Sequence, residues 1–394
     1  MKNEFNLPIQ AATRATLVDE YYFSTKLQEI QRMRQSGKDI INLGIGSPDQ
    51  APHPDVIKTL EHSAWQNENH GYQSYKGTDA LREAFASWYF RYFGIALNPG
   101  NEILPLMGSK EGIMHISMAF LDPGDEVLIP NPGYPTYSSV TKIVGATPVY
   151  YELDALSNWL PDLDALEQSD LSKVKLMWIN YPHMPSGAIA TKEFFEAVIA
   201  FGKRHNILIC NDNPYAFILN AAPMSLLSVD GSKEIALELN SLSKSHNMPG
   251  WRMGMVAGHA YYIQQILKIK SNMDSGMFRP LQDAAVTALQ LKEEWYQNIN
   301  KMYLERKTIV HQLFDALKCT YQVPQSGLFV WAKVPDDIQS AVELSDTLLY
   351  STHVFVTPGF IFGSKGDRYL RISLCADKSR LEQALERINN QLKN

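Results

Sequence analysis

The sequence predicts an α/β fold, in which helices cover both faces of a sheet, joined to a smaller α+β lobe. Three observations lead to this prediction. The chain has 394 residues, which suggests two domains. Short apolar runs of four or five residues alternate with helical patterns through its middle, as is typical of strands buried on both faces. From about residue 282, long helical stretches replace this alternation and indicate the second lobe.

The elements expected in the first lobe follow from apolar spacing and from the turn residues that separate the runs. Helical patterns cover residues 111–120 and 193–204. The apolar runs that predict strands lie at residues 126–129, 147–151, 175–179, 207–210, 235–239 and 253–257.

The elements expected in the second lobe are longer. Helical patterns cover residues 283–291, 295–317 and 379–391, and strand patterns lie at residues 328–334, 354–356 and 369–374. No Gly/Ser-rich linker marks the boundary near residue 285, so this boundary depends on the change of pattern alone.

Composition and charge argue against several classes of partner. The chain has 36 Lys and Arg against 42 Asp and Glu, a net charge of −6, which does not favour nucleic acid or an anionic membrane surface. No apolar run approaches the roughly 18–20 residues that span a bilayer, and the N-terminus lacks the apolar core of a signal peptide. Cys210, Cys319 and Cys375 share no CxxC spacing, which favours a reducing compartment. We therefore expect a cytoplasmic protein.

The signatures of several common enzyme classes are missing. The sequence contains no GxGxxG, GxxxxGK[ST], HExxH or GxSxG motif. Its ten histidines show no metal-ligand spacing, so we expect no metal site. These absences remove the main support for dinucleotide, P-loop, zinc-protease and α/β-hydrolase functions.

A lysine-containing loop follows the strand predicted at residues 235–239. It reads Ser241-Leu-Ser-Lys244-Ser-His-Asn-Met-Pro-Gly-Trp-Arg252. A partly desolvated lysine beside hydroxyls and an arginine suits imine chemistry next to a phosphate. A solvated loop lysine is the ordinary alternative. The Ser-x-x-Lys spacing also matches a Ser–Lys acyl-transfer motif, but residues 139–142 match it too, and the companion motifs of that enzyme class are absent.

A second polar loop, Asn211-Asp212-Asn-Pro-Tyr215, follows the strand predicted at residues 207–210. An aspartate at this position can hold a pyridine nitrogen protonated. An Asx turn is the alternative use of these residues.

Two more segments suggest a ligand. Ser109 and Lys110 open a helical pattern after the apolar residues 103–107, and the start of a helix binds phosphate well. Here Ser109 could instead be an ordinary N-cap. Tyr134 lies in a proline-rich aromatic turn that offers a stacking face, or simply packs the turn.

Taken in order, these segments resemble the class I/II aminotransferases of the aspartate aminotransferase superfamily, fold type I of the pyridoxal-phosphate enzymes. The resemblance runs from Ile-Asn-Leu-Gly-Ile-Gly46-Ser-Pro-Asp to Tyr-Leu-Arg371-Ile-Ser, and the Lys244 loop is its most specific motif. It implies a large domain at residues 49–285, with a mostly parallel seven-stranded sheet. It also implies a small α+β domain built from both chain ends, residues 1–48 (with an N-terminal arm) and 286–394.

The resemblance also implies a role for each matched residue. Lys244 would form a Schiff base with pyridoxal 5'-phosphate and move the substrate's α proton. Asp212 would pair with the pyridine nitrogen, Tyr215 with the phenolic oxygen, and Tyr134 would stack on the ring. The remaining implied contacts are Ser109, Lys110, Ser241, Arg252 and the partner subunit's Tyr72 with the phosphate, and Arg371 and Gly46 with the substrate carboxylate.

One position departs from the family pattern. Met184 stands where the family usually has an asparagine that donates to the phenolic oxygen of the cofactor. His183 is adjacent and polar, but neighbours on an extended segment point to opposite sides, so we do not transfer the role to it. Losing this donor should change the pKa of the Schiff base.

The sequence therefore predicts a homodimeric aminotransferase that acts on an α-amino acid and a 2-oxo acid. A C–S β-lyase, or another pyridoxal-phosphate enzyme that does not transaminate, shares every motif. A Ser–Lys hydrolase is a remote alternative. A non-catalytic regulator would be expected to lack Lys244 or Asp212, and both are present. The sequence does not name the amino acid, although Arg279 is a candidate to bind a distal carboxylate.

Overall fold

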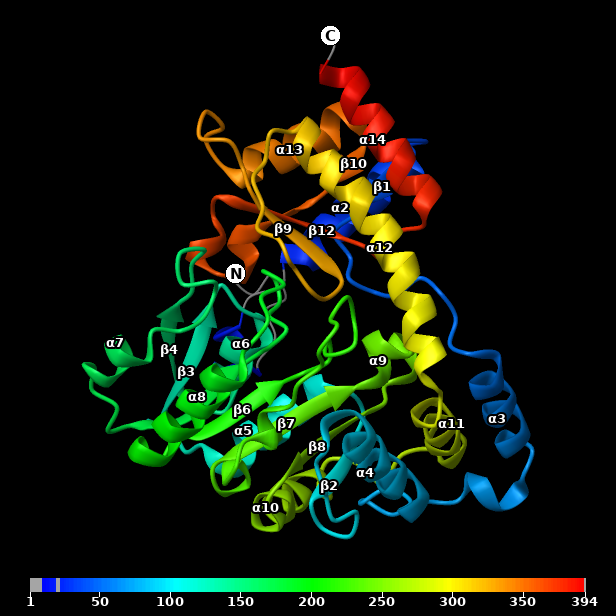
Figure 1. Cartoon of the computed structure of the whole chain (residues 1–394), viewed down its shortest axis with the longest axis vertical. Coiled ribbons are helices and arrows are strands. Elements are labelled where there is room, and N and C mark those ends of the chain that lie inside the picture. The colour runs from blue at the N-terminus through cyan, green and yellow to red at the C-terminus, as the bar shows by residue number, and fades with distance from the viewer. Residues whose placement is uncertain (1–8, 19–21, 393–394) are drawn as a thin grey trace.

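A seven-stranded sheet is the centre of the larger part of the protein in a computed structural model, which describes residues 9–18 and 22–392 (Figure 1). The strands lie in the order β2-β8-β7-β6-β5-β3-β4. All neighbours are parallel except β8, which is antiparallel to both β2 and β7. The strands are β2 (Ile103–Leu106), β3 (Glu126–Asn131), β4 (Thr147–Glu152), β5 (Val174–Ile179), β6 (Leu208–Asp212), β7 (Ala236–Ser241) and β8 (Gly254–Gly258).

Helices cover both faces of this sheet, because its strands carry apolar side chains on both sides. In β5, Leu176 and Trp178 pack in one hydrophobic cluster, and Met177 and Ile179 pack in the other. This alternation follows from the two-residue period of a strand. The helices of this part are α3 (Pro54–Ala64), α4 (Asp79–Phe93), α5 (Ser109–Phe120), α6 (Thr136–Ile143), α7 (Leu163–Glu167), α8 (Lys192–His205), α9 (Leu242–Ser245), α10 (Ala260–Lys270) and α11 (Arg279–Leu289).

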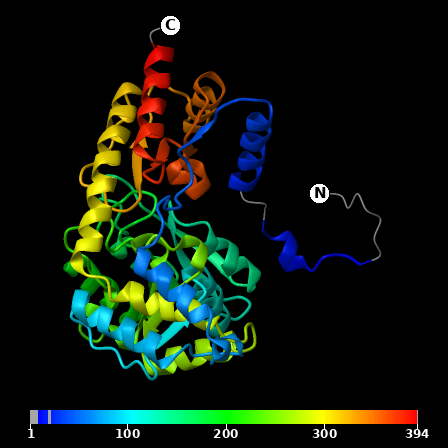
Figure 2. The ribbon, with the colours of Figure 1, turned by 90° about the vertical axis from the view of Figure 1, so that its right-hand side faces the viewer.

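The smaller part lies above the sheet in Figure 1 and joins the two ends of the described chain. Strand β1 (Ile41–Asn42) pairs in parallel with β10 (Val354–Phe355), and β12 lies between β11 and β9 in a second, antiparallel sheet. Figure 2 shows α12 and α14 side by side, and they pack closely. The other elements of the smaller part are α2 (Tyr22–Gln35), α12 (Glu293–Ala316), β9 (Phe329–Lys333), α13 (Ala341–Thr352), β11 (Thr357–Pro358), β12 (Tyr369–Ser373) and α14 (Lys378–Leu392). The short helix α1 (Thr13–Thr16) lies next to α6 of the larger part.

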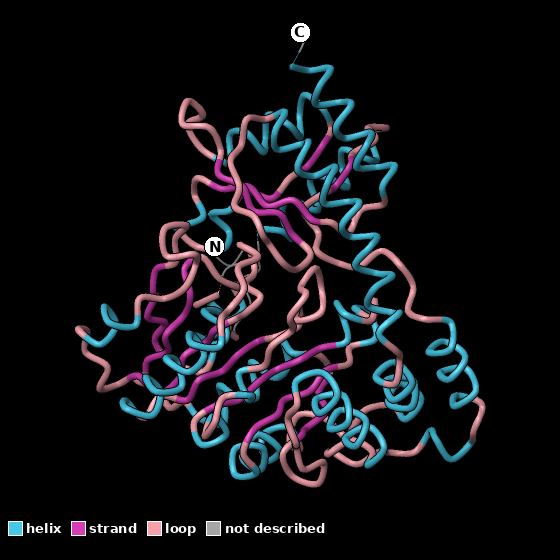
Figure 3. The backbone as a smooth tube through the Cα atoms, in the orientation of Figure 1, coloured by secondary structure: helices cyan, strands magenta, loops and turns pink. Residues whose placement is uncertain are grey.

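Six single-turn 3₁₀ helices complete the described elements. They are η1 (Asn67–His70), η2 (Leu226–Ser228), η3 (Ser232–Glu234), η4 (Pro249–Trp251), η5 (Gly359–Phe362) and η6 (Ser364–Gly366). Figure 3 shows that the region between the large sheet and the smaller part consists mostly of loops. Loops at the carboxyl ends of strands are where α/β proteins place ligands.

The architecture confirms the predicted fold class, including the mostly parallel seven-stranded sheet. Strand β6 continues to Asp212, two residues past its expected end, so this carboxylate belongs to the sheet rather than to the turn. The domain boundaries at residues 48 and 285 stay predictions. The N-terminal arm falls partly on residues 1–8 and 19–21, which lie outside the described residues.

Two further findings concern the chain as a whole. Among the described residues, none of the helices combines the length and the apolar character that crossing a membrane requires. Cys210, Cys319 and Cys375 are buried free thiols.

Candidate active site

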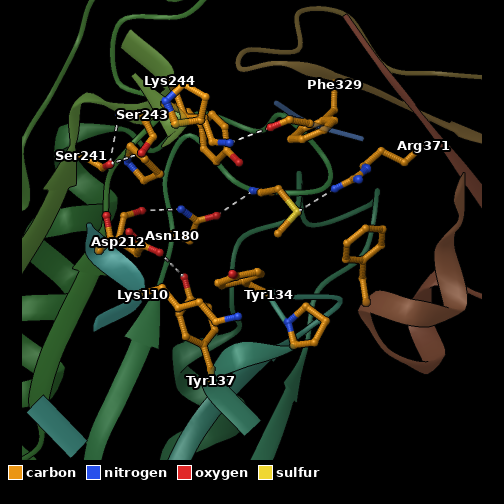
Figure 4. A pocket seen from close by; sticks show the side chains of 18 of the residues that line it. Lys110, Tyr134, Tyr137, Asn180, Asp212, Ser241, Ser243, Lys244, Phe329 and Arg371 are labelled. Carbon is orange, nitrogen blue, oxygen red and sulfur yellow. Dashed lines mark hydrogen bonds between the residues drawn. The ribbon is translucent and has the colours of Figure 1, made fainter. Parts of the chain in front are cut away.

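A cavity of about 550 Å³ lies between the carboxyl ends of the sheet strands and the smaller part. It brings together all the predicted site residues except Tyr72 and Arg279: Gly46, Ser109, Lys110, Tyr134, Asp212, Tyr215, Ser241, Lys244, Arg252 and Arg371. Figure 4 shows Asp212 and Tyr137 on one side of this cavity and Arg371 with Phe329 on the other.

Lys244 is held on a single helical turn, α9, that directly follows β7. Its Nζ donates to the carbonyl oxygen of Gly46 at 2.6 Å, so the amine is aimed across the cavity toward the smaller part. Burial lowers the pKa of the Lys244 ammonium below its usual value. A lysine whose neutral form is favoured in this way can act as a nucleophile or as a base.

Asp212 ends β6 and is 5% exposed. The hydroxyl of Tyr137 donates to its Oδ2 at 3.0 Å, whereas its Oδ1 is buried and has no hydrogen-bond partner. Burial raises the pKa of Asp212 to about 7, and the Tyr137 hydrogen bond and the Lys244 charge oppose this rise. A buried carboxylate oxygen without a donor is costly, which indicates that a cationic or N–H group of a ligand completes the site.

The start of α5 and the loop before β8 form another part of the cavity wall. Gly108, not Ser109, is the N-cap of α5, which overturns the ordinary-cap alternative for Ser109. The Ser109 hydroxyl is buried and has no partner in the structure. Gly108 has φ +86°, and a Cβ there would lie 2.3 Å from Nη2 of Arg252. The absence of a side chain therefore lets the guanidinium approach the start of the helix, where backbone N–H groups attract anions.

Two serines and Lys110 add polar groups to this part of the cavity wall. Ser241 caps α9, and its hydroxyl lies 2.9 Å from Ser243 Oγ and 3.2 Å from the carbonyl oxygen of Met253, either of which can accept its single proton. Hydroxyls, an arginine, a lysine and a helix start at one place can bind a phosphate.

Arg371 lies on β12 and is 5% exposed. It donates to the carbonyl of Gly44 at 2.8 Å, and its Nε is buried without a partner. Burial lowers the pKa of Arg371 to about 10. No carboxylate of the described chain pairs with it within salt-bridge distance. A buried guanidinium that lacks an anionic partner is suited to bind the carboxylate of a ligand.

The segment after β5 contains Met184, the residue that departs from the family pattern. Nη1 of Arg371 contacts the Met184 sulfur at 3.4 Å, so Met184 faces the cavity. His183 points away from it and bonds Ser186 and the carbonyl of Pro132. Both ends of the Asn180 amide are engaged, with the backbone of Asp212 and of Met184. His183 therefore does not supply the donor that Met184 lacks.

Two tyrosines complete the described lining around Asp212. Tyr134 packs edge-on against Tyr137, with ring centroids 5.6 Å apart. Tyr215 is buried, and this burial raises the pKa of its hydroxyl. Its hydroxyl is therefore protonated near neutral pH and can donate a hydrogen bond to a ligand.

Two predicted residues do not reach this cavity. Tyr72 is 94% exposed and lies outside the lining of its own site. Arg279 also lies outside it, and its Nε donates to Asp283 Oδ1 at 2.7 Å.

Sequence reasoning missed several residues that shape the site. Tyr137 lies in the same aromatic turn as Tyr134, and that shared turn was the only signal for it. Phe329 and Phe362 fall in ordinary apolar patterns, which do not distinguish a site residue from a core residue. The lining residues without a predicted role are Phe23, Pro135, Tyr137, Asn180, Met184, Pro214, Ser243, Pro249, Phe329 and Phe362.

One group of potential metal ligands exists elsewhere in the described residues. Ligand atoms of Glu111, His115 and Asp274 lie within 4.8 Å of one another. None of the three lines the cavity. The ammonium of Lys270 already lies 2.6 Å from Asp274 Oδ2 and supplies a positive charge there.

Comparisons with known proteins agree with this geometry. The family model described as "Aminotransferase class I and II" matches residues 38–388. A protein named LL-diaminopimelate aminotransferase from Natranaerobius thermophilus is 42% identical over 96% of this chain and 99% of its own length. The relative of that name from Moorella thermoacetica is 39% identical over 98% and 99%. The solved structure of apo-BacF from Bacillus subtilis superposes with a TM-score of 0.93 at 34% identity and covers 97% of this chain and 98% of its own.

Proposed function

The chain belongs to the class I and II aminotransferase family, and on that premise we propose that pyridoxal 5'-phosphate binds in the cavity as its cofactor. Two buried polar atoms support this fit. Asp212 Oδ1 lacks a donor and suits the protonated nitrogen of a pyridine ring, and the partnerless Ser109 hydroxyl suits a phosphate at the start of α5. Cation, hydroxyl and backbone N–H donors thus stand at one end of the cavity, and a carboxylate stands deep inside it.

When bound, this cofactor supplies an aldehyde carbon that reacts with amines and a ring that accepts the electron pair released at the substrate's α carbon. Lys244 provides the amine that holds the cofactor before substrate arrives. Because burial favours its neutral form, its Nζ can afterwards accept the α proton and return it one step later. Its hydrogen bond to the Gly46 carbonyl fixes the direction from which it approaches.

Asp212 keeps a proton on the ring nitrogen. Its ionised form is unfavourable in the buried site without a partner, so a cationic N–H at Oδ1 stabilises both groups. Tyr137 holds the other carboxylate oxygen and fixes the plane of the carboxyl group. Tyr134 offers a ring face to the cofactor, and Tyr215 donates to its phenolic oxygen.

Arg371 binds the α-carboxylate of the amino acid. Its guanidinium lacks an anionic partner in the described chain, and one of its nitrogens is buried without an acceptor. Two parallel hydrogen bonds to a carboxylate would satisfy it. The substrate then lies between Arg371 and Lys244, with the backbone of Gly46 near its carboxylate.

The observation that carries this proposal is that Lys244 and the partnerless Oδ1 of Asp212 line one cavity. The test is a half-reaction. Holoenzyme mixed with a single amino donor, without any oxo acid, should convert its cofactor to pyridoxamine phosphate and release one equivalent of oxo acid. Release of pyruvate, ammonia and a thiol from cysteine conjugates, with the cofactor unchanged, would instead identify a C–S β-lyase.

The hydrolase alternative has no support in the geometry. The Ser241 hydroxyl has its acceptors in Ser243 Oγ and the Met253 carbonyl, and Lys244 Nζ donates to the carbonyl of Gly46. The serine and the lysine are therefore each engaged elsewhere, whereas a Ser–Lys pair would need a hydrogen bond between them.

A homodimer with shared sites is part of the proposal. Tyr72 is nearly fully exposed, and three more large exposed side chains lie in the segments around it: Tyr75, Met273 and Phe278. The two segments are adjacent, because a Cβ on Gly276 would lie 2.4 Å from the carbonyl oxygen of Gln73. An exposed apolar patch of this kind is typical of an interface. Sedimentation of the holoenzyme should give twice the chain mass, and a fully active monomer would refute the shared site.

A further inference from the structure

We propose that this enzyme selects amino acids that have a large apolar side chain, aromatic or branched aliphatic, and a single carboxylate. The inference rests on the proposed function and names the substrate class for it. It differs from what the relatives' names suggest, because LL-diaminopimelate has a second ammonium and a second carboxylate at its far end.

The first argument is that the charged groups of the cavity already have tasks. Five charged side chains line it in the described chain: Lys110, Asp212, Lys244, Arg252 and Arg371. Asp212 and Lys244 serve the ring and its aldehyde, and Lys110 and Arg252 stand at the phosphate end. Arg371 serves the α-carboxylate. This assignment leaves no charged side chain for the far end of a substrate.

The second argument is the wall around Arg371. The guanidinium carbon lies 3.9 Å from the ring centroid of Phe329, 4.6 Å from that of Phe362 and 5.8 Å from that of Phe23. The Met184 sulfur closes the same region. These side chains come from β9, η5, α2 and the loop after β5, so several separate parts of the chain present apolar surface to one place. Figure 4 shows the Phe329 ring beside Arg371.

The third argument concerns the groups that a doubly charged substrate would need. Asp212 is the only carboxylate that lines the cavity in the described chain, so a second ammonium would have no anionic partner. Arg279, the candidate for a distal carboxylate, is paired with Asp283, which also accepts from Ser63 at 2.7 Å. Burying an unpaired charge is unfavourable, whereas a phenyl or isobutyl group would gain contact with the wall.

The direct test is binding of acids that lack the amino group and cannot react. We expect 3-phenylpropanoate and 4-methylpentanoate to bind the holoenzyme at least about tenfold more tightly than glutarate or 6-aminohexanoate, as measured by calorimetry. The holoenzyme is used in its native assembly, so a charge brought by a partner subunit would be detected. Glutarate or 6-aminohexanoate binding as tightly as 3-phenylpropanoate would overturn the inference.

A donor comparison separates this inference from the proposed function. L-phenylalanine and L-leucine should drive the half-reaction with a kcat/KM at least about tenfold above that of L-aspartate or LL-diaminopimelate. A preference for LL-diaminopimelate or L-aspartate would overturn the substrate class and leave the aminotransferase intact. If no donor converts the cofactor, the proposed function fails instead.

A matched pair of variants on α2 tests the wall itself. Phe23→Ala removes a ring that lines the cavity. Leu27→Ala shortens a side chain of the same helix that does not line the cavity but, like Phe23, packs against the small apolar cluster of Ile30, Ile40, Leu349 and Phe355. Phe23→Ala should weaken 3-phenylpropanoate binding about fivefold or more and leave acetate binding within about twofold, and Leu27→Ala should change neither. An equal loss in both variants, or no loss in Phe23→Ala, would show that Phe23 does not contact the substrate side chain.

Discussion

Replacing Asp212 with asparagine should slow the half-reaction while the cofactor still binds. The Asp212→Asn side chain keeps the shape and the Tyr137 hydrogen bond but removes the charge at the partnerless Oδ1. A hydrogen bond to a charged group contributes about 1.5–3 kcal/mol. At about 1.4 kcal/mol per factor of ten, the rate should fall roughly tenfold to a hundredfold. Lys244 and the phosphate end are unchanged, so covalent attachment of the cofactor should survive.

The assay is the stopped-flow change in cofactor absorbance on mixing with an amino donor, with the rate normalised to bound cofactor. Glu238→Gln is the matched control, because Glu238 is a buried carboxylate on the neighbouring strand β7 that does not line the cavity. It should alter stability but not the normalised rate. A wild-type rate in Asp212→Asn would refute the reasoning, and Asp212 would then be a structural residue of the strand end.

Four further outcomes are expected. Met184→Asn should add a donor to the cavity that Tyr215 also lines and lower the pH midpoint of the cofactor's absorbance change by about one unit or more, and an unchanged midpoint would contradict this. Arg371→Lys should lower kcat/KM at least about tenfold, because lysine cannot form two parallel hydrogen bonds to a carboxylate, and an unchanged value would argue against that contact. Gly108→Ala should weaken cofactor binding, measured by fluorescence titration, because its Cβ would meet Arg252. Gly94→Ala is the control, because Gly94 also has positive φ but an added Cβ there would have no atom within 4 Å. Equal effects of the two substitutions would point to backbone strain alone. In the apoprotein, burial raises the pKa of Asp212 from 3.8 to about 7, so its contribution to stability is fully present below pH 4 and is lost as the pH rises through 7. The free energy of unfolding should therefore fall by up to about 4 kcal/mol over this pH range. Urea unfolding of Asp212→Asn at the same pH values should show no such fall.

The sheet could be predicted from the sequence because its strands are apolar on both faces and are separated by turn residues. The sequence also led to most of the polar residues that line the cavity, because Lys244 and Ser109 each follow a strand and Asp212 ends one, and parallel strands bring their carboxyl ends together. The ten predicted residues that line the cavity come from segments far apart in the chain. In the sequence, only the order of the motifs indicated that these residues belong to one site.

The rest of the site depends on packing that local patterns do not encode. Phe329 and Phe362 have the same sequence pattern as core residues, and only the meeting of β9, η5 and β12 places them against Arg371. The alternation of an extended segment suggested that the His183 side chain points away from the cavity. Its hydrogen bonds to Ser186 and Pro132 fix that direction. The pairing of Arg279 with Asp283 on the next helical turn was visible as an i, i+4 spacing, but its relation to the cavity was not.

The most direct test of the central claim is to find which lysine holds the cofactor. Holoenzyme reduced with borohydride and digested should give one pyridoxyl-labelled peptide, and sequencing should place the label on Lys244. Lys244→Ala should take up no label, and Lys270→Ala, which removes a buried lysine outside the cavity, should still be labelled on Lys244. A label on any other lysine in the wild-type protein would contradict the assignment of the cavity as the active site.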